Sequence, residues 1–242
     1  MERDIYRKMA DFQERHWWFC ARRELLSAEI TRLKLPARPH ILEIGCGPGG
    51  NLSMLQEHGQ VSAMEMDLYA RQHATKRYAV HVVEGWLPGN IPFEEGRFDL
   101  ICLFDVLEHI GDDDSALKVL RRYLSPGGYF LLSAPAYPWL FGLHDRLHHH
   151  HRRYTLRGLS GQLCSHGYSI QSSTYFNSVL FPLVLWARAV DFLGSSQISK
   201  GTVLPKPWLN KLLYRFFCSE VRLLDNWRLP FGTSVLIAAQ SA

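Results

Sequence analysis

Ile41-Leu42-Glu43-Ile44-Gly45-Cys46-Gly47-Pro48-Gly49-Gly50-Asn51 is the most informative stretch of this sequence. A short apolar run ends in a group of glycines, and a helical pattern begins at Leu52. This order predicts a buried strand, a tight turn and a helix N-terminus, where unpaired backbone N–H groups face a ligand. Gly45, Gly47 and Gly50 satisfy GxGxxG, which by itself suits a dinucleotide enzyme equally well. The stretch therefore predicts a nucleotide-type binding loop and leaves the nucleotide open.

Composition indicates a folded chain with a sizeable core. The 242 residues are 47% hydrophobic and 21% charged, which allows one large domain or one domain with an elaborated cap. The net charge of +4 is spread along the chain, so we expect no nucleic-acid partner. Five scattered cysteines without a CxxC pair indicate neither a disulfide framework nor a zinc knuckle. The charged N-terminus shows no secretory signal, and we expect a cytoplasmic protein.

Strand and helix patterns alternate after the glycine loop, which predicts a parallel, doubly wound α/β sheet. The expected strands are residues 41–44, 61–64, 81–83, 98–104, 129–133, 168–175 and 234–238. The expected helices between them are residues 52–56, 69–77, 115–123 and 156–166. About fifty residues with helical periodicity, 176–230, separate the last two strands. A hairpin needs only a few residues, so this segment is predicted to be a helical insertion that caps the site.

The N-terminal segment, residues 4–33, has the periodicity of an amphipathic helix. Trp17, Trp18 and Phe19 are consecutive and cannot all share one helix face. These aromatic residues either pack the helix onto the sheet or form a lid over the nucleotide pocket. In the second case, Arg22 or Arg23 would pair with a ligand carboxylate.

Two further positions suit contacts to a nucleoside. Glu65 follows the second expected strand, twenty positions after Gly45, which suits a bidentate grip on ribose hydroxyls. Asp67 lies two residues farther on and is expected to cap the next helix. The turn after the third strand would let Trp86 or Leu87 cover an adenine ring; the alternative is a surface tryptophan on a loop.

Four separated motifs together resemble the class I S-adenosylmethionine-dependent methyltransferases. They are the glycine loop, Glu65, Phe104-Asp105-Val106-Leu107-Glu108-His109-Ile110 and Leu124-Ser125-Pro126-Gly127-Gly128. The resemblance covers roughly residues 41–175. Two more stretches, His16 to Phe19 and His151 to Thr155, are similar to a methyltransferase-11-like group related to ubiquinone-pathway O-methyltransferases.

This resemblance implies a Rossmann-like, seven-stranded sheet with its last strand antiparallel, S-adenosylmethionine as cofactor and S-adenosylhomocysteine as product. Gly45 and Gly47 would pass under the methionine part, and Phe104 and Asp105 would meet its amino-acid end. The implied cofactor residues are Trp18, Arg22, Glu43, Gly45, Cys46, Gly47, Glu65, Met66, Gly85, Trp86, Leu87, Phe104, Asp105 and His109. Many relatives carry an aspartate near Gly85 or Trp86 for the adenine amino group, and this chain has none there. The predicted domains are an N-terminal helical lid, 1–36, the cofactor domain, 37–175 with 231–242, and the helical insertion, 176–230.

Residues 134–155 follow the carboxyl end of a central strand, where acceptors bind in such folds. A hydroxyl acceptor benefits from a general base. We prefer His144 and Asp145 for the base or for acceptor contacts, ahead of His151 and Tyr154. The histidine run could equally be a solvated loop, and no fixed spacing supports a metal site, so none is predicted. Arg152-Arg153 would bind an anionic acceptor, cap a helix or bridge to Asp112–Asp114.

The leading prediction is a methyltransferase acting on oxygen of a small aromatic or lipid-like acceptor. The apolar stretches 179–190 and 208–217 favour an apolar, lipid-like acceptor. Basic residues of the insertion would also allow contact with a membrane surface, and the same face could form a homodimer interface. These basic residues are Arg188, Lys200, Lys206, Lys211 and Arg215. A nicotinamide-dependent oxidoreductase leaves the Asp105 and Pro126-Gly127-Gly128 motifs unexplained. A non-catalytic cofactor-binding subunit is the third alternative.

Overall fold

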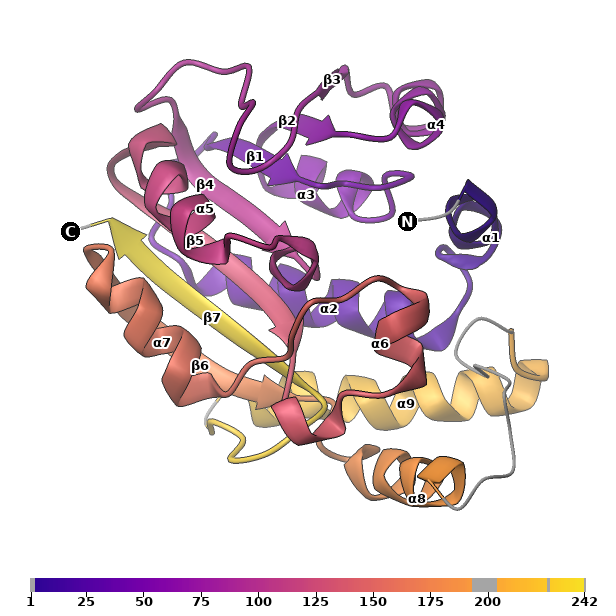
Figure 1. The fold of residues 1–242 in the computed structure, drawn as a ribbon. Coiled ribbons are helices and arrows are strands. Elements are labelled where there is room, and N and C mark those ends of the chain that lie inside the picture. Colours follow the sequence, from indigo (N-terminus) through magenta and orange to yellow (C-terminus); the bar gives the residue numbers. More distant parts are fainter. Residues whose placement is uncertain (1–2, 193–203, 226, 242) are drawn as a thin grey trace.

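The computed structural model describes residues 3–192, 204–225 and 227–241 and has a seven-stranded sheet flanked by helices (Figure 1). The strand order is β3-β2-β1-β4-β5-β7-β6, with β7 antiparallel to both neighbours and the remaining pairs parallel. The strands are β1 His40–Ile44, β2 Gln60–Glu65, β3 Val82–Glu84, β4 Phe98–Phe104, β5 Leu124–Pro135, β6 Tyr168–Phe176 and β7 Ser234–Ser241. The predicted doubly wound sheet with an antiparallel last strand is confirmed.

Helices cover both faces of this sheet (Figure 1). They are α1 Arg3–Phe12, α2 Trp17–Arg32, α3 Leu52–His58, α4 Leu68–Tyr78, α5 Asp113–Leu120, α6 Leu143–Leu147, α7 Leu156–Ser165, α8 Phe181–Phe192 and α9 Pro207–Leu223. Three short 3₁₀ turns are η1 Leu107–His109, η2 Arg121–Tyr123 and η3 Pro138–Leu140. Asp67 caps α4 with its side chain, as the sequence predicted, and Asp112 caps α5 in the same way.

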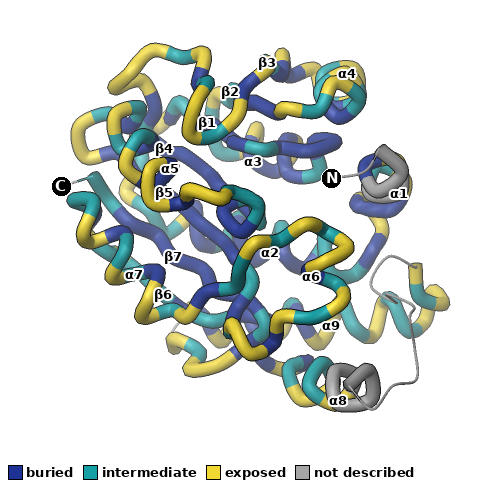
Figure 2. Tube along the Cα trace, in the orientation of Figure 1, coloured by how far each residue is buried: buried dark blue, intermediate teal, exposed yellow. Residues whose placement is uncertain are grey.

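The core forms two apolar layers because successive residues of a strand point to opposite faces. Leu42 packs with α5 and α7 on one face, whereas Ile41 packs with α2 and α9 on the other. Both layers are deeply buried, as the tube in Figure 2 shows along β4, β5 and β7. The central strands are therefore apolar at nearly every position.

Among the described strands, β5 departs most from its expected bounds. The sequence predicted a strand over residues 129–133, but β5 spans Leu124–Pro135 and so includes Pro126-Gly127-Gly128. Its pairing with β4 is irregular between Phe98 and Leu100, and Gly127 has a φ of 75°. The glycine accommodates a bend that keeps Leu124 opposite Phe98, so the Pro-Gly-Gly sequence bends the strand without ending it.

The insertion contributes α8 and α9. α9 packs against α2, and its Phe217 is fully buried in the same apolar layer. α8 starts beside η3, where the Phe181 and Tyr137 rings lie 5.8 Å apart. The middle of the predicted insertion, including Lys200, and the side chain of Arg188 lie outside the described residues. The predicted division into lid, cofactor domain and insertion stays a prediction.

Candidate functional site

The glycine loop after β1 brings bare backbone to the carboxyl edge of the sheet. Gly45 has a φ of 66°, and a Cβ there would lie 2.7 Å from Cγ2 of Val106. Any larger residue would therefore collide with the segment after β4. The loop N–H of Gly47 donates to Oε2 of Glu65 at 3.0 Å. The loop, the end of β2 and the end of β4 thus meet at one place.

Glu65 is a buried acceptor at that meeting point, 4% exposed. Its Oε1 accepts from the N–H of Asp67 at 2.9 Å and from the hydroxyl of Tyr6 at 3.3 Å. Tyr6 belongs to α1, which packs against α4. A side-chain hydroxyl from the N-terminal helix therefore occupies one lone pair of the carboxylate that the sequence predicted for a ribose.

Asp105 and Arg22 form an ion pair between the end of β4 and α2. Asp105 has a φ of 54°, and its carboxylate also accepts from Oγ of Ser133 at 3.2 Å. The Arg22 guanidinium lies 4.6 Å from the centre of the Trp18 ring, in cation–π geometry. Arg23 turns away and donates to the backbone carbonyls of Gln13 and Gly50. Of the two candidate arginines, Arg22 is the one at the site.

Glu43 and Cys46 lie beneath the loop. Oε1 of Glu43 accepts from Asn51 at 2.7 Å, whereas its buried Oε2 has no hydrogen-bond partner. Burial raises the pKa of Glu43 to about 7 and also raises the pKa of the Cys46 thiol. Both residues support the loop from inside.

The residues predicted for the adenine side lie around the turn after β3. Gly85 is buried, Leu87 is half-buried against the core, and Trp86 is 47% exposed. Met66, at the end of β2, is 67% exposed. Phe104 belongs to the core layer under α2. The turn is thus an open rim with one large exposed ring.

Asp145 organises the histidine-rich segment. It is fully buried and accepts from the Gly142 N–H at 2.8 Å, from Nδ1 of His150 at 2.9 Å and from Nε of Arg153 at 2.8 Å. Burial alone would raise the pKa of Asp145. The hydrogen bonds from His150 and Arg153 outweigh it and hold this pKa well below its usual range. Asp145 is therefore an ionised anchor for its neighbours.

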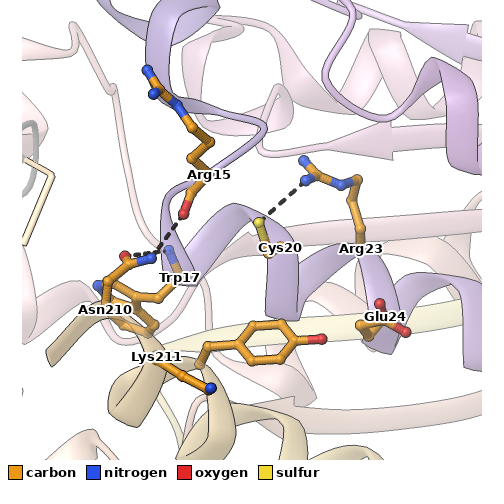
Figure 3. Close-up of a pocket in the computed structure, with 8 residues that line it drawn as sticks. Arg15, Trp17, Cys20, Arg23, Glu24, Asn210 and Lys211 are labelled. Atoms are coloured by element: carbon orange, nitrogen blue, oxygen red, sulfur yellow. Dashed lines mark hydrogen bonds between the residues drawn. The ribbon is translucent and has the colours of Figure 1, made fainter. Parts of the chain in front are cut away.

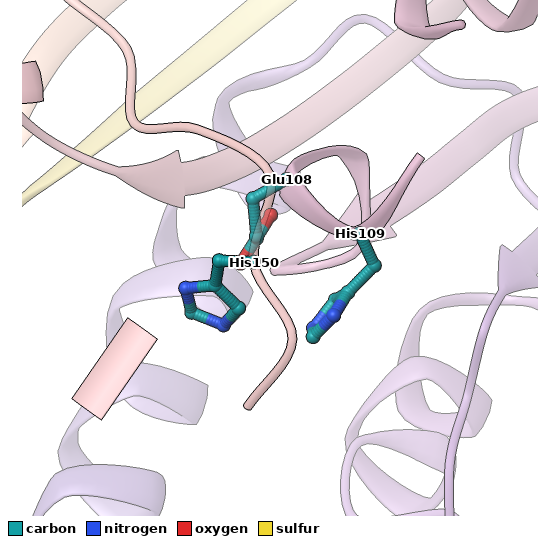
Figure 4. A group of neighbouring side chains, drawn as sticks. All are labelled: Glu108, His109 and His150. Atoms are coloured by element: carbon teal, nitrogen blue, oxygen red, sulfur yellow. The ribbon is translucent and has the colours of Figure 1, made fainter. Parts of the chain in front are cut away.

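Four histidines gather beside this anchor. The ring centres of His109 and His150 are 4.7 Å apart, those of His144 and His148 are 4.3 Å apart, and those of His148 and His150 are 5.9 Å apart. Burial, together with His150 and His148, lowers the pKa of His109 to about 3. Its imidazole is thus neutral at physiological pH. Glu108 lies with His109 and His150 (Figure 4).

His151 and Tyr154 occupy different surroundings. The His151 side chain is exposed, and its backbone N–H donates to the Glu108 carbonyl at 2.7 Å. The Tyr154 hydroxyl is buried and donates to Oδ2 of Asp113 at 2.8 Å, and burial raises its pKa. Arg152 also binds Asp113, at 2.7 Å, which is the bridging alternative that the sequence left open. The structure does not bring Tyr154 to the histidine cluster.

Three stacked rings, Tyr137, Trp139 and Tyr175, form an aromatic wall between the end of β5 and α8. The Tyr137 ring stacks on Trp139 at 5.3 Å and on Tyr175 at 5.1 Å. Trp139 is 64% exposed, and the α6 side chains Leu143 and Leu147 are also exposed. The wall therefore presents apolar surface next to the histidine-bearing helix.

In the described part of the chain, two cavities lie beside α2 and do not reach Glu65 or Asp105. One of about 440 Å³ separates the start of α2 from α9 (Figure 3). The other, of about 310 Å³, lies between α2 and α3. Neither is lined by a predicted cofactor residue. At the carboxyl edge of the sheet, α1 covers Glu65 through Tyr6 and α2 covers Asp105 through Arg22.

A family model described as a methyltransferase domain matches residues 18–179. The chain belongs to this methyltransferase family. A biotin biosynthesis bifunctional protein from Bordetella avium is 32% identical over 137 residues, covering 52% of this chain and 28% of that protein. A ubiquinone biosynthesis O-methyltransferase from Pectobacterium carotovorum is 30% identical over 100 residues, covering 38% of this chain and 41% of that protein. The chain spans half or less of these curated relatives.

Solved structures show the same fold. A sarcosine dimethylglycine methyltransferase structure from Galdieria sulphuraria matches with a TM-score of 0.64 at 15% identity, covering 93% of this chain and 86% of that one. A geranyl diphosphate methyltransferase, solved in complex with geranyl diphosphate and sinefungin, matches with a TM-score of 0.61 at 16% identity. The match covers 90% of this chain and 78% of that one. The cofactor that the motifs predicted, S-adenosylmethionine, is thus that of the family.

The site of this chain fits such a cofactor. The bare loop can approach a ligand closely, Glu65 offers a buried carboxylate for two hydroxyls, and Arg22 offers a guanidinium for a carboxylate. The sequence did not single out three residues that the structure places at Glu65 or in the histidine cluster: Tyr6, Glu108 and His150. Glu108 stands inside the Asp105 motif and His150 inside the histidine run, so both had a local signal. Tyr6 had none.

Proposed function

We propose that this methyltransferase transfers a methyl group from S-adenosylmethionine to a hydroxyl oxygen of a small aromatic or lipid-like acceptor. The observation that carries the acceptor class is the aromatic wall of Tyr137, Trp139 and Tyr175 leading into the histidine-bearing α6. Stacked and exposed rings favour flat or apolar ligands. The Pectobacterium relative is named as an O-methyltransferase, which supports oxygen as the acceptor atom.

The binding roles follow from the contacts. Glu65 would hold the ribose hydroxyls, and Gly45 and Gly47 would lie against the methionine part. Arg22, held over Trp18, would exchange its bond to Asp105 for the ligand carboxylate. The other residues that we propose to surround the cofactor are Glu43, Cys46, Met66, Gly85, Trp86, Leu87, Phe104 and His109. When bound, the cofactor supplies a methyl group on a positively charged sulfur.

The protein's part in the chemistry is to position the acceptor, exclude water and receive a proton. Methyl transfer needs the acceptor oxygen in line with the methyl group, so positioning supplies much of the rate. His144 is the preferred group to receive the hydroxyl proton. Asp145 acts as a positioning residue through His150 and Arg153, and His151 is the second candidate base. The buried bond to Asp113 argues against Tyr154 in this role.

Exposed apolar side chains of the insertion support a lipid-like acceptor. They are Leu183, Trp186, Trp208, Leu212 and Phe216. Lys206, Lys211 and Arg215 are exposed among them, which suits contact with an anionic lipid surface or with a second copy of the chain. No helix in the described part of the chain has the length and apolarity to cross a bilayer.

Calorimetry with S-adenosylmethionine, S-adenosylhomocysteine and NADH tests the cofactor, followed by an acceptor screen with a labelled methyl donor. We expect both sulfur ligands to bind, and catechol-like or prenylated phenols to accept label. Binding of NADH alone would overturn the proposal. His144→Ala should reduce kcat about 100-fold or more while S-adenosylhomocysteine affinity is unchanged. Exposed His149→Asn is the matched control, because asparagine tolerates the φ of 57° at that position.

A further inference from the structure

We propose that Glu108, His109 and His150 form a binding site for one divalent transition-metal ion of the zinc type. The three residues come from η1 and from the loop after α6, so the fold alone brings them together (Figure 4). The sequence predicted no metal because no fixed ligand spacing is present. Residues 108 and 150 are too far apart in the chain to form a motif.

The geometry suits a single ion. One ligand atom from each residue lies within 4.8 Å of the others. Zinc binds nitrogen and oxygen at roughly 2.0–2.2 Å, so the ligand atoms of one ion lie roughly 3–4 Å apart. Small rotations of the two imidazole rings would close the remaining distance.

Glu108 supplies an independent observation. Its side chain is 1% exposed, and its Oε2 has no hydrogen-bond partner. A buried carboxylate oxygen without a partner is costly, and native proteins seldom keep one without a reason. A cation held between Glu108 and the two histidines would satisfy this oxygen.

His150 is already arranged as a metal ligand. Oδ1 of Asp145 also accepts from Nε of Arg153, so it is an acceptor, and Nδ1 of His150 carries the proton of their 2.9 Å hydrogen bond. The other ring nitrogen, Nε2, then presents its lone pair. Metal-binding histidines almost always donate their second nitrogen to a carboxylate or carbonyl in this way. Arg153 and the Gly142 N–H fix Asp145 in turn.

The donor set selects the class of ion. Two imidazoles and one carboxylate favour Zn²⁺, Co²⁺ or Ni²⁺ over Mg²⁺ and Ca²⁺, which prefer oxygen ligands. Three protein ligands leave an open coordination position, as in catalytic zinc sites. η1 follows β4 and Asp105 directly, which places the site beside the proposed cofactor contacts. If the proposed function holds, the open position would bind the acceptor hydroxyl and lower its pKa.

Metal titration of the full chain tests the site. The protein is stripped with a chelator and dialysed, then titrated with Zn²⁺, Co²⁺ and Mg²⁺. Readouts are calorimetry, elemental analysis and the visible absorption of bound Co²⁺. We expect one Zn²⁺ or Co²⁺ per chain and far weaker Mg²⁺ binding. Glu108→Gln and His150→Ala should each weaken Zn²⁺ binding on the order of 100-fold or more. Losing a residue that only hydrogen-bonds to a metal ligand already weakens binding about 10- to 100-fold, and losing the ligand itself should weaken it more. His149→Asn should bind like the wild type.

The outcomes separate this inference from the proposed function. Binding of S-adenosylhomocysteine to the same stripped sample shows that the chain and each variant are folded and that the cofactor site works. Absent Zn²⁺ and Co²⁺ binding, preference for Mg²⁺, or unchanged Zn²⁺ affinity in Glu108→Gln would overturn the metal site alone. Zn²⁺ binding without S-adenosylhomocysteine binding would instead overturn the proposed function and leave the metal site standing.

Discussion

Glu65 is the side chain that we expect to bind the ribose of the cofactor. It is buried at the end of β2, and the glycine loop donates to one of its oxygens. Glu65→Ala should weaken S-adenosylhomocysteine binding about 10- to 100-fold, because hydrogen bonds to a charged group contribute roughly 1.5–3 kcal/mol. Isothermal titration calorimetry measures the change. Glu94→Ala, at an exposed loop position, is the control. Equal affinities in the two variants would place the ribose elsewhere.

Glu43 predicts a pH dependence of stability. Its pKa is about 7 in the folded chain and near its ordinary 4.5 when unfolded. The native state therefore binds more protons between these values, so stability falls as pH rises from about 4.5 to about 7 and levels off above. The loss is on the order of 3 kcal/mol. Glu43→Gln keeps an acceptor for Asn51 and should flatten this slope in urea unfolding at pH 5 and pH 8. An unchanged slope would show that another group is responsible.

Single residues could be predicted where their role follows from a nearby element. Asp67 was correctly predicted as a helix cap from its place after the strand. Glu65 stays a prediction for the ribose, made from its distance to Gly45. The structure places Arg22 with Asp105, although the sequence left Arg22 and Arg23 open. The meeting of His109 with His150 was beyond prediction, because α5, β5 and α6 separate them in the chain.

At the scale of elements, α1 is the segment whose position bears most on the site. The Tyr6 hydroxyl bonds to Glu65, so it competes with a ribose hydroxyl for the same oxygen. Tyr6→Phe should therefore tighten S-adenosylhomocysteine binding about 3- to 10-fold, which corresponds to part of one hydrogen bond to a charged group. Tyr123→Phe, which removes a remote hydroxyl bonded to the Ile91 carbonyl, is the control. Weaker binding in Tyr6→Phe would mean that Tyr6 contacts the ligand directly.

Most elements could be predicted, since apolar runs and turn residues mark them clearly. β4 has the predicted bounds, and α4 differs by one residue at each end. β5 was predicted too short because Pro126-Gly127-Gly128 usually ends a strand. Pairing with β4 at Phe98 extends it through these residues, and such pairing is a tertiary contact that the local sequence does not record.

At the scale of the whole molecule, α9 joins the insertion to the core. Phe217 is fully buried between α9 and the sheet, whereas its neighbour Phe216 is 46% exposed. Phe217→Ala should destabilise the entire chain by about 3–5 kcal/mol, the usual cost of truncating a buried phenylalanine. Phe216→Ala should change stability by about 0.5 kcal/mol or less. Chemical unfolding followed by circular dichroism measures both.

The shape of that transition is the second part of the same experiment. One cooperative step, with loss of S-adenosylhomocysteine binding at the same urea concentration, is expected for Phe217→Ala. A separate early step would instead show that residues 176–230 unfold as an independent cap. The sequence indicated helices in this segment but could not say which surface they cover. Helical periodicity identifies an apolar face, not its partner.

The bond between Tyr6 and Glu65 also bears on how quickly spent cofactor leaves. As a ribose hydroxyl withdraws, the tyrosine hydroxyl can take its place, so Oε1 of the buried carboxylate keeps a second donor beside the Asp67 N–H. Such an exchange lowers the barrier to product departure, since the desolvated charge is satisfied throughout. The N-terminal helix would then act as an internal displacing ligand. In Tyr6→Phe, S-adenosylhomocysteine should become a stronger product inhibitor, and steady-state turnover should slow where release limits the rate.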